Sequence, residues 1–406
     1  MPRWIKRTLV VLLAALALLA VLAIWQRDRI ERLLAVNTLF DEAHIVANFS
    51  DMPSLFFHQQ MTNGNELPWD LPQAATPLPA QVPDGTGGTL DIAAWAAERS
   101  LTALVVLKDG EIVAEEYFQG TDADDLRISW SVAKSFLSAL TGILVEEGAI
   151  ESLDAPVTDY APLLAKSAYR DATIRDVLQM ESGVTFNEDY LDFHSDINKM
   201  GRVLALGGSM DAFAAGLEGQ DRPPGEAWQY VSIDTHVIGM VLRGATGRSV
   251  PDLMEEKLIR PLGLEAGPVY LTDGEGVAFV LGGLNLRTRD YARMGLLVLQ
   301  KGRRGPAQII PANWLAESTA PSAKTAPGEI GYGYQWWVPQ DSDEDEVLAR
   351  GIYGQFIYIN RDRGVVVAIN SADRGFREPG AFAQNMAAFR ALAGAAAPDG
   401  SGAATN

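Results

Sequence analysis

The chain has 406 residues, of which 48% are hydrophobic and 21% charged, and this composition is typical of a globular protein with a sizeable core. Its formal net charge of −19 argues against nucleic acid as a partner, because phosphate binding needs clustered Lys and Arg. Cysteine is absent and the four His are scattered, which excludes disulfides and thiolate catalysis, and we expect no metal and no other cofactor.

The N-terminus combines basic residues with a long apolar run. Three basic residues within positions 3–7 precede an apolar stretch from Thr8 to Trp25, a run of about eighteen residues that is nearly enough to span a membrane. This length favours an uncleaved membrane anchor over residues 1–25. A cleavable signal peptide is the alternative, because residues 21–23 match a small-residue cleavage pattern. In both cases we expect the rest of the chain to be exported, into the periplasm in a Gram-negative cell.

Residues 26–88 are predicted to be an extended segment that precedes the main domain. A basic stretch, Gln26 to Val36, comes first, and the chain after it has little periodicity and many prolines. We interpret the segment as a linker that can pack against the domain.

The main domain is predicted to span residues 89–393. It begins with a helix over Leu90 to Arg99 and two strands, Thr102 to Leu107 and Glu111 to Phe118. The sequence Asp109-Gly110 between the strands is a strong signal for a two-residue hairpin turn.

The middle of the domain is rich in helical patterns, and strands return near its end. Helices are expected over 131–146, 173–180, 230–242, 250–259, 288–300 and 380–393. Strands are expected over 333–338, 347–350, 356–359 and 365–369, and residues 394–406 are expected to form a disordered tail. This order predicts an α/β fold in which an antiparallel sheet with flanking helices carries an all-α insert. A crevice between the two parts is the natural place for a site.

Ser131 and Lys134 lie where the chain crosses from the sheet to the helical part. Three residues apart, they share one face of the first helical turn. A hydroxyl beside an ammonium at a helix N-terminus is a plausible activated nucleophile. An S-x-x-K sequence arises by chance about 0.4 times in a chain of this composition, so the pair alone fits a helix-capping serine and a solvated lysine as well.

Further motifs, in the same order, resemble the serine penicillin-recognising hydrolases, namely class C β-lactamases, DD-peptidases and related esterases and 6-aminohexanoate-dimer hydrolases. Ser131 to Lys134 matches their S-x-x-K motif, and Tyr230-Val231-Ser232 is similar to their Tyr-x-Asn or Tyr-x-Ser element. Supporting stretches occur at 173–183, 282–293 and 331–337. The resemblance covers about residues 89–393. It implies a β-lactamase/transpeptidase-like fold with Ser131, Lys134 and Tyr230 as catalytic residues.

The third motif departs from the family pattern of Lys-Thr-Gly or His-x-Gly. The best match is Ile352-Tyr353-Gly354, where Ile352 stands in place of the cation. A buried substrate carboxylate without a partner is costly, so this departure argues against efficient β-lactam hydrolysis. The resemblance implies that Ile352, Tyr353 and Gly354 contact the substrate, and that the N–H groups of Ser131 and Gln355 form an oxyanion hole.

Three further residues are candidates for substrate contact. Tyr190 and Asp192 lie in a loop that carries an aromatic near the substrate in the 6-aminohexanoate-dimer hydrolases, although Tyr190 fits a surface aromatic equally well. Ser232 either joins the site or only caps the following helix. The sequence from Glu188 to Asp192 superficially resembles the E-x-x-L-N element of class A β-lactamases, but it follows Ser131 too closely, and we interpret it as a coincidence.

The resemblance implies a serine hydrolase that cleaves small esters or amides, such as 6-aminohexanoate-type amides or carboxylic esters, through an acyl-enzyme on Ser131. A β-lactamase or DD-peptidase is the first alternative, and a membrane-tethered sensor that is acylated but not turned over is the second. The expected partners are a small-molecule ester or amide and, through the N-terminal segment, a membrane. The sequence does not indicate an oligomeric state.

Overall fold

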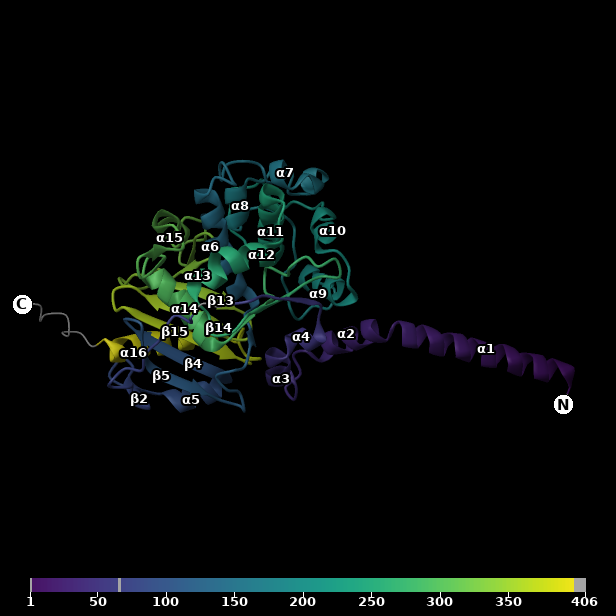
Figure 1. The fold of residues 1–406 in the computed structure, drawn as a ribbon, viewed down its shortest axis with the longest axis horizontal. Helices are drawn as coiled ribbons and strands as arrows, with labels where there is room; N and C mark the ends of the chain where they lie inside the picture. Colours follow the sequence, from purple (N-terminus) through teal and green to yellow (C-terminus); the bar gives the residue numbers. More distant parts are fainter. Residues whose placement is uncertain (1, 65–66, 398–406) are drawn as a thin grey trace, which may run out of the picture.

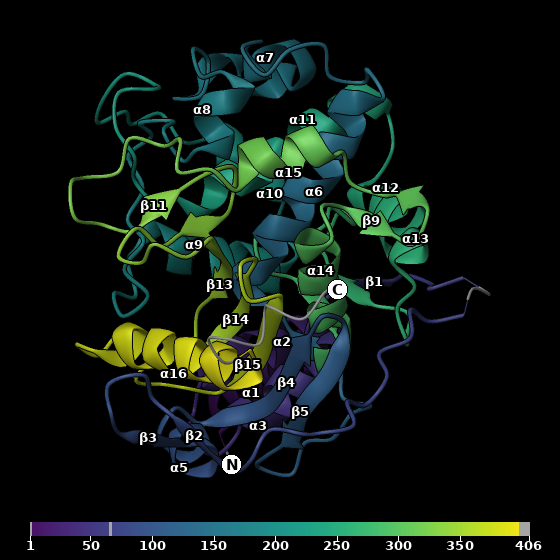
Figure 2. The ribbon, with the colours of Figure 1, turned by 90° about the vertical axis from the view of Figure 1, so that its left-hand side faces the viewer.

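A seven-stranded antiparallel sheet forms one part of the molecule, and a group of helices forms the other (Figures 1 and 2). This computed structural model describes residues 2–64 and 67–397. The strand order is β11-β12-β13-β14-β15-β4-β5, so strands from both ends of the domain meet, as predicted. The strands are β4 (Leu101–Lys108), β5 (Glu111–Tyr117), β11 (Gly331–Tyr332), β12 (Trp337–Val338), β13 (Glu346–Gly351), β14 (Gln355–Asn360) and β15 (Val365–Ser371).

Both faces of the large sheet are covered by helices. In the middle of β4, the odd-numbered residues Val105 and Leu107 face a core shared with α14 (Thr288–Leu299). Residues with even numbers, such as Val106, face α5 (Ile92–Glu98) and α16 (Ala381–Ala396). The hairpin between β4 and β5 turns at Asp109 and Gly110, whose φ angles of 52° and 92° confirm the predicted two-residue turn.

The helical part is built around α6 (Ala133–Glu146), in which every residue from Ala133 to Leu144 is buried. A helix that is buried all round must be enclosed by other elements. The remaining elements of this part are η1 (Trp130–Val132), α7 (Val157–Tyr160), η2 (Pro162–Lys166), α8 (Ile174–Leu178), α9 (Asp196–Leu206), α10 (Met210–Ala215), α11 (Ser232–Thr246), α12 (Val250–Met254), η3 (Glu255–Ile259), α13 (Arg260–Leu262) and α15 (Ala312–Ser318). The short strands beside it are β6 (Arg127–Ile128), β7 (Val269–Leu271), β8 (Leu284–Leu286), β9 (Arg303–Arg304) and β10 (Ala307–Gln308).

The segment 26–88 contains regular structure, in contrast to the extended conformation expected for it. Its elements are α2 (Arg27–Thr38), α3 (Ile45–Ser50), α4 (Met52–Leu55), β1 (His58–Gln60) and β2 (Gln81–Pro83), and β2 pairs with β3 (Thr89–Asp91) at the start of the main domain. β1 pairs with β7, and α2 packs against α9. The buried guanidinium of Arg127 donates to the carbonyl of Val46 over 2.9 Å and to the hydroxyl of Ser50. Helices of four to six residues are too short to show a hydrophobic period, which explains why the sequence pattern missed them.

Residues 333–338 do not form the single strand that was predicted. The chain turns between β11 and β12, where Gln335 has a φ angle of 64°. The N–H of Tyr334 donates to the carbonyl of Ser318 over 2.9 Å, which draws the chain out of the ladder. At the C-terminus, α16 continues to Ala396, beyond the predicted start of the tail at residue 394, and residues 398–406 of that tail lie outside the described residues.

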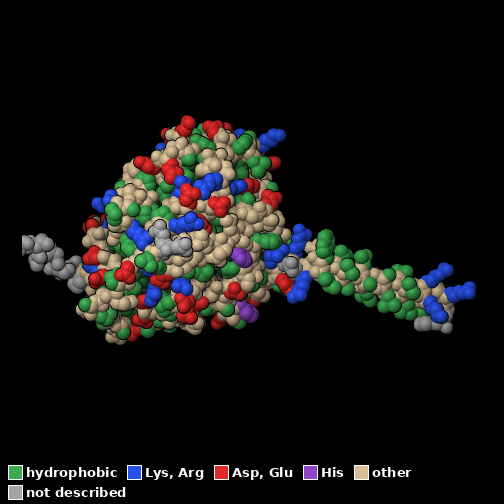
Figure 3. Space-filling view, in the orientation of Figure 1, with side chains coloured by type: hydrophobic (Ala, Val, Ile, Leu, Met, Phe, Trp, Pro, Cys, Tyr) green, Lys and Arg blue, Asp and Glu red, His purple; other side chains and the backbone are tan. Residues whose placement is uncertain are grey.

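The N-terminal helix α1 (Arg3–Trp25) projects away from the rest of the molecule (Figure 1). Over Arg3–Leu22 it has a mean hydropathy of 2.3, and none of it is buried. Hydrophobic side chains cover its length, with Lys and Arg at both ends (Figure 3). The helix is long and apolar enough to cross a membrane, and a signal sequence has the same properties.

We expect Phe389→Ala to lower the free energy of unfolding by about 3 to 5 kcal/mol, because a cavity remains where a buried ring is removed. Phe389 lies between Trp95, Phe356 and Tyr358, with ring centroids 5.3–6.0 Å apart. Urea unfolding of the full chain in detergent measures the change. Phe382→Ala on the same helix removes a half-buried ring and should cost less, and equal losses would contradict this account.

Candidate active site

Ser131 lies in the η1 turn that leads into α6, at the junction of the sheet and the helical part. The preceding Trp130 has a φ angle of 42°, which is rare for a bulky residue and bends the chain sharply at this point. Strain of this kind concentrates at functional sites. The side chain of Ser131 is at the edge of burial, and two cavities meet at it.

Lys134 lies one turn further along α6 and is fully buried. Its ammonium donates to the carbonyl of Leu281 over 3.0 Å and lies 5.6 Å from the centre of the Tyr230 ring. Burial lowers the pKa of Lys134 to about 7, and the nearby carboxylates of Glu188 and Asp234 only partly oppose this shift. Near neutral pH a large share of Lys134 is therefore a neutral amine, which can accept a proton.

Tyr230 lies just before α11, and its ring stacks on Trp337 at 5.4 Å. Burial and the charge of Glu188 raise the pKa of the Tyr230 phenol well above its usual value, while hydrogen bonding to Ser131 opposes the rise. The phenol is therefore neutral and within hydrogen-bonding reach of Ser131. The structure thus brings together Ser131, Lys134 and Tyr230, which lie up to about a hundred residues apart in the sequence.

Glu188 lies in the same site, although its sequence motif was interpreted as a coincidence. Its carboxylate accepts hydrogen bonds from the N–H of Ser232 over 3.0 Å, from the Ser232 hydroxyl, and from the Tyr190 hydroxyl over 2.7 Å. The contact joins the loop after α8 to the start of α11. The spacing of the class A element did not predict this position, and no other local pattern marks it.

The glycine that approaches Ser131 closely is Gly351, at the end of β13, rather than Gly354. A Cβ atom on Gly351 would lie 2.7 Å from the carbonyl oxygen of Ser129 and 3.1 Å from the amide nitrogen of Ser131, so only glycine fits. Gly354 instead faces Ser371 in the turn between β13 and β14, where its φ angle is 82°.

The other residues predicted around this turn lie in different surroundings. Ile352 lines both cavities together with Ser131. Tyr353 stacks on Phe40 of the N-terminal segment at 4.6 Å. The side-chain amide of Gln355 is buried and donates to the carbonyl of Ser371 over 2.7 Å.

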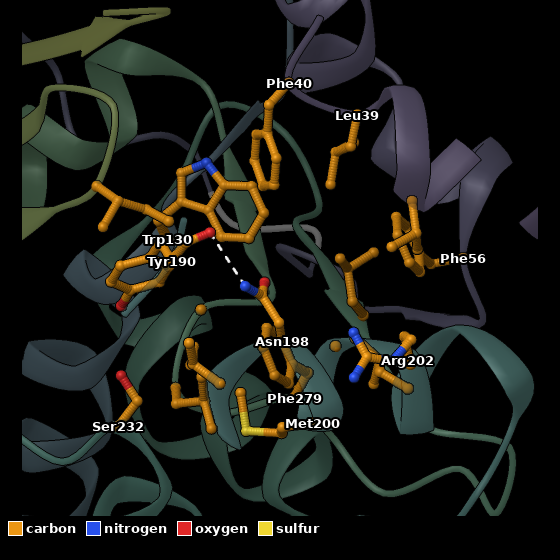
Figure 4. Close-up of a pocket in the computed structure, with 18 of the residues that line it drawn as sticks. Leu39, Phe40, Phe56, Trp130, Tyr190, Asn198, Met200, Arg202, Ser232 and Phe279 are labelled. Carbon is orange, nitrogen blue, oxygen red and sulfur yellow. Dashed lines mark hydrogen bonds between the residues drawn. The ribbon is translucent and has the colours of Figure 1, made fainter. Parts of the chain in front are cut away.

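Of the two residues predicted in the loop after α8, Tyr190 faces the cavities and Asp192 does not line them. Tyr190 lines both cavities, and its backbone carbonyl accepts a hydrogen bond from Asn198 over 3.0 Å (Figure 4). The carboxylate of Asp192 accepts hydrogen bonds within its own loop, from the N–H of His194 over 2.8 Å and from Asn187 over 3.4 Å. Asp192 therefore shapes the loop rather than the cavity.

The two cavities that meet at Ser131 differ in chemistry. The first, here called the polar cleft, is lined by charged and polar side chains, among them Glu188, Asp189, Tyr230, Arg350 and Arg377. The second, here called the apolar pocket, extends from Ser131 and Ser232 to the N-terminal segment (Figure 4). Apolar side chains such as Phe40, Phe56, Met200 and Phe279 line it.

The beta-lactamase family profile matches residues 94–391. The chain belongs to the beta-lactamase family. It is 29% identical over 291 residues to the 6-aminohexanoate-dimer hydrolase of Paenarthrobacter ureafaciens, covering 68% of this chain and 73% of that protein.

Solved structures share the fold. A putative 6-aminohexanoate-dimer hydrolase from Bacillus anthracis superposes with a TM-score of 0.77 and 22% identity, covering 88% of this chain and 95% of that one. A family VIII carboxylesterase superposes with a TM-score of 0.56 and 17% identity, covering 74% and 96%. The predicted β-lactamase/transpeptidase-like fold is confirmed, and the protein is a hydrolase.

We expect the rate at which a fluorophosphonate labels Ser131 to rise about tenfold per pH unit below pH 7 and to level off above it. The neutral form of Lys134, whose pKa is about 7, is the one that can accept the serine proton, and it increases with pH. A rate that stays flat across neutral pH would contradict a role for Lys134 as base.

Glu188→Gln provides a control for this pH profile. The Glu188 carboxylate raises the pKa of Lys134, so its removal should move the midpoint of the labelling profile to lower pH. Glutamine keeps the shape and one acceptor oxygen for Ser232 and Tyr190, which separates the charge effect from loss of structure.

Proposed function

We propose that this protein is a serine hydrolase that cleaves small carboxylic esters or amides, including amides of the 6-aminohexanoate type, through an acyl-enzyme on Ser131. The observation that carries the proposal is the convergence of a hydroxyl, a buried amine of lowered pKa and a neutral phenol at Ser131, Lys134 and Tyr230. The similarity to a 6-aminohexanoate-dimer hydrolase supports the substrate class.

In the proposed reaction, Ser131 Oγ attacks the carbonyl carbon while Lys134 accepts the hydroxyl proton. The tetrahedral intermediate collapses, the bond to the leaving group breaks, and Tyr230 passes a proton to the departing oxygen or nitrogen. Water then attacks the acyl-enzyme and gives a proton to the Tyr230 phenolate, and the Ser131 oxygen leaves with the proton that Lys134 holds. This step releases the acid and restores Ser131, Lys134 and Tyr230 to their starting states. The neutral state of the phenol and the lowered pKa of Lys134 support this division of roles.

The backbone N–H of Ser131 is the proposed first donor to the oxyanion. Gln355 was predicted as the second donor on the assumption that Gly354 is the motif glycine. The close approach of Gly351 to Ser131 instead supports the N–H of Ile352, the next residue, which lines both cavities. One such donor typically stabilises the transition state by about 3 to 4 kcal/mol.

We also propose that the hydrolase is exported and stays attached to the membrane through α1. The length, hydropathy and complete exposure of that helix support an anchor. Mass spectrometry of the membrane-bound protein tests this, and a mature chain that starts near Ile24 would contradict it.

Ser131→Ala should lower hydrolysis of p-nitrophenyl butyrate by about 10⁴-fold or more and abolish fluorophosphonate labelling, because the acyl-enzyme cannot form. Ser138→Ala is the matched control. Ser138 lies on α6, the helix that follows the η1 turn of Ser131. It is buried, and its hydroxyl has no hydrogen-bond partner in the described part of the chain. Activity that survives in Ser131→Ala would contradict the proposed function.

A second candidate function, β-lactam or D-peptide hydrolysis, is favoured by Arg350. This residue lies one position before Gly351 and lines the polar cleft, and its guanidinium stacks 5.4 Å from the ring of Trp337 and 4.2 Å from that of Phe382. The cation that the third motif lacks at Ile352 is thus available from Arg350. A guanidinium in a cleft is suited to a substrate carboxylate.

Arg350→Met should lower kcat/KM for the carboxylate-bearing substrate nitrocefin by about 10- to 100-fold, the range expected for a lost hydrogen bond to a charged group. Hydrolysis of the neutral p-nitrophenyl butyrate serves as the control and should change by less than about threefold. The absence of any nitrocefin turnover by the wild type would end this second candidate.

A further inference from the structure

We propose that the apolar pocket binds the acyl chain of the substrate, so that the hydrolase prefers esters and amides of aliphatic acids several carbons long. The proposal rests on the proposed function, because it takes Ser131 as the residue that is acylated.

The size and lining of the apolar pocket suit an aliphatic chain. The pocket has a volume of about 310 Å³ and begins at Ser131. Phe40 and Phe56 form one wall from the N-terminal segment, and Met200 of α9 lies opposite them (Figure 4). Leu204 of α9 also lines the pocket.

Asn198 and Arg202 also line the pocket, and they donate to the backbone carbonyls of Tyr190 over 3.0 Å and of Phe193 over 2.9 Å. Most of the other lining side chains are apolar, so an apolar group gains the most from entering the pocket.

The position of Tyr230 decides which half of the substrate enters the apolar pocket. Tyr230 lines the polar cleft and not the apolar pocket. A general acid must reach the leaving group, so the leaving group lies on the side of the polar cleft. The acyl part, which stays attached to Ser131 after the leaving group departs, is then directed into the apolar pocket.

Gly201 is a second, independent observation. It lies in the middle of α9, where glycine is unfavourable for a helix, and it lines the apolar pocket. A Cβ atom on Gly201 would meet no atom within 4 Å, so close packing does not require glycine here. The absence of a side chain at Gly201 enlarges the pocket, and a long acyl chain needs this additional space.

Apolar side chains also continue to the opening of the pocket. Leu191 and Phe193 both line it and are 87% and 61% exposed, although exposed large apolar side chains are costly in water. They belong to the loop that carries Tyr190, next to the start of α9. A chain that leads inward from solvent therefore contacts apolar groups along its whole path.

The test compares chain lengths with the full chain reconstituted in phosphatidylcholine vesicles. Each methylene that moves from water into an apolar site favours binding about fourfold, so kcat/KM for p-nitrophenyl octanoate should exceed that for p-nitrophenyl acetate by more than about tenfold. Gly201→Phe fills the pocket and should lower the octanoate-to-acetate ratio about tenfold or more. Gly201→Ala is the matched control and should keep the wild-type ratio.

Three results would overturn the proposal. The first is a wild type that does not prefer octanoate over acetate, and the second is an unchanged octanoate-to-acetate ratio in Gly201→Phe. The third is an equal loss of octanoate and acetate hydrolysis in both Gly201→Phe and the smaller Gly201→Leu, while fluorophosphonate labelling persists. Comparing ratios among variants in the same vesicles cancels the partition of octanoate into the lipid. Failure of the proposed function can be told apart from failure of the pocket proposal. In the first case the wild type hydrolyses neither ester, and in the second it hydrolyses both without the expected preference.

Discussion

The site depends on keeping the amine of Lys134 out of water. An ammonium in water would hold its proton and leave Ser131 an ordinary alcohol. Burial in α6, with a carbonyl oxygen of Leu281 as its fixed partner, makes the neutral amine accessible near pH 7. That burial requires α11, α12 and α15 to pack around α6, while β13 and β14 of the sheet pack against the preceding η1 turn. The fold thus provides the buried environment that lowers the pKa of Lys134.

The charged groups around Lys134 set a limit on this effect. Glu188 and Asp234 both favour the protonated amine, so the pKa of Lys134 reflects a balance between burial and two carboxylates. Asp234 accepts hydrogen bonds from Tyr169 over 2.6 Å and from Ser182 over 2.9 Å, and burial raises its pKa to about 7. Lys134 and Asp234 both titrate near neutral pH and interact electrostatically. Protonation of one of them therefore shifts the pKa of the other.

Much of the fold could be predicted because it depends on patterns between residues that are close in the sequence. The apolar run of β4, the Asp109-Gly110 turn and the three-residue spacing of Ser131 and Lys134 are each contained within a few residues, so the sequence reveals them. Gly351 and Gly354 lie three residues apart in one turn, and only the approach to the Ser131 amide distinguishes them. Glu188 could not be found either, since its partners on α11 lie more than forty residues away.

The N-terminal segment escaped prediction for a related reason. This segment packs against elements that are formed by residues much later in the chain, such as β7 and α9. Short helices and three-residue strands carry too little pattern of their own to be read in isolation. Contacts between distant segments, rather than propensity, decide the structure there.

The aromatic contacts of Trp130 have a practical consequence. Its positive φ angle sets the direction in which the chain enters Ser131, and its ring packs against the rings of Phe40 and Phe49 with centroid distances of 5.7 and 5.5 Å. Both phenylalanines belong to the segment that follows α1. Trimming the gene to the residues matched by the family profile would remove this support together with the hydrophobic helix. A soluble version for crystallisation should therefore begin between α1 and Phe40. Such a chain keeps the contacts of Phe40 and Phe49 with the ring of Trp130.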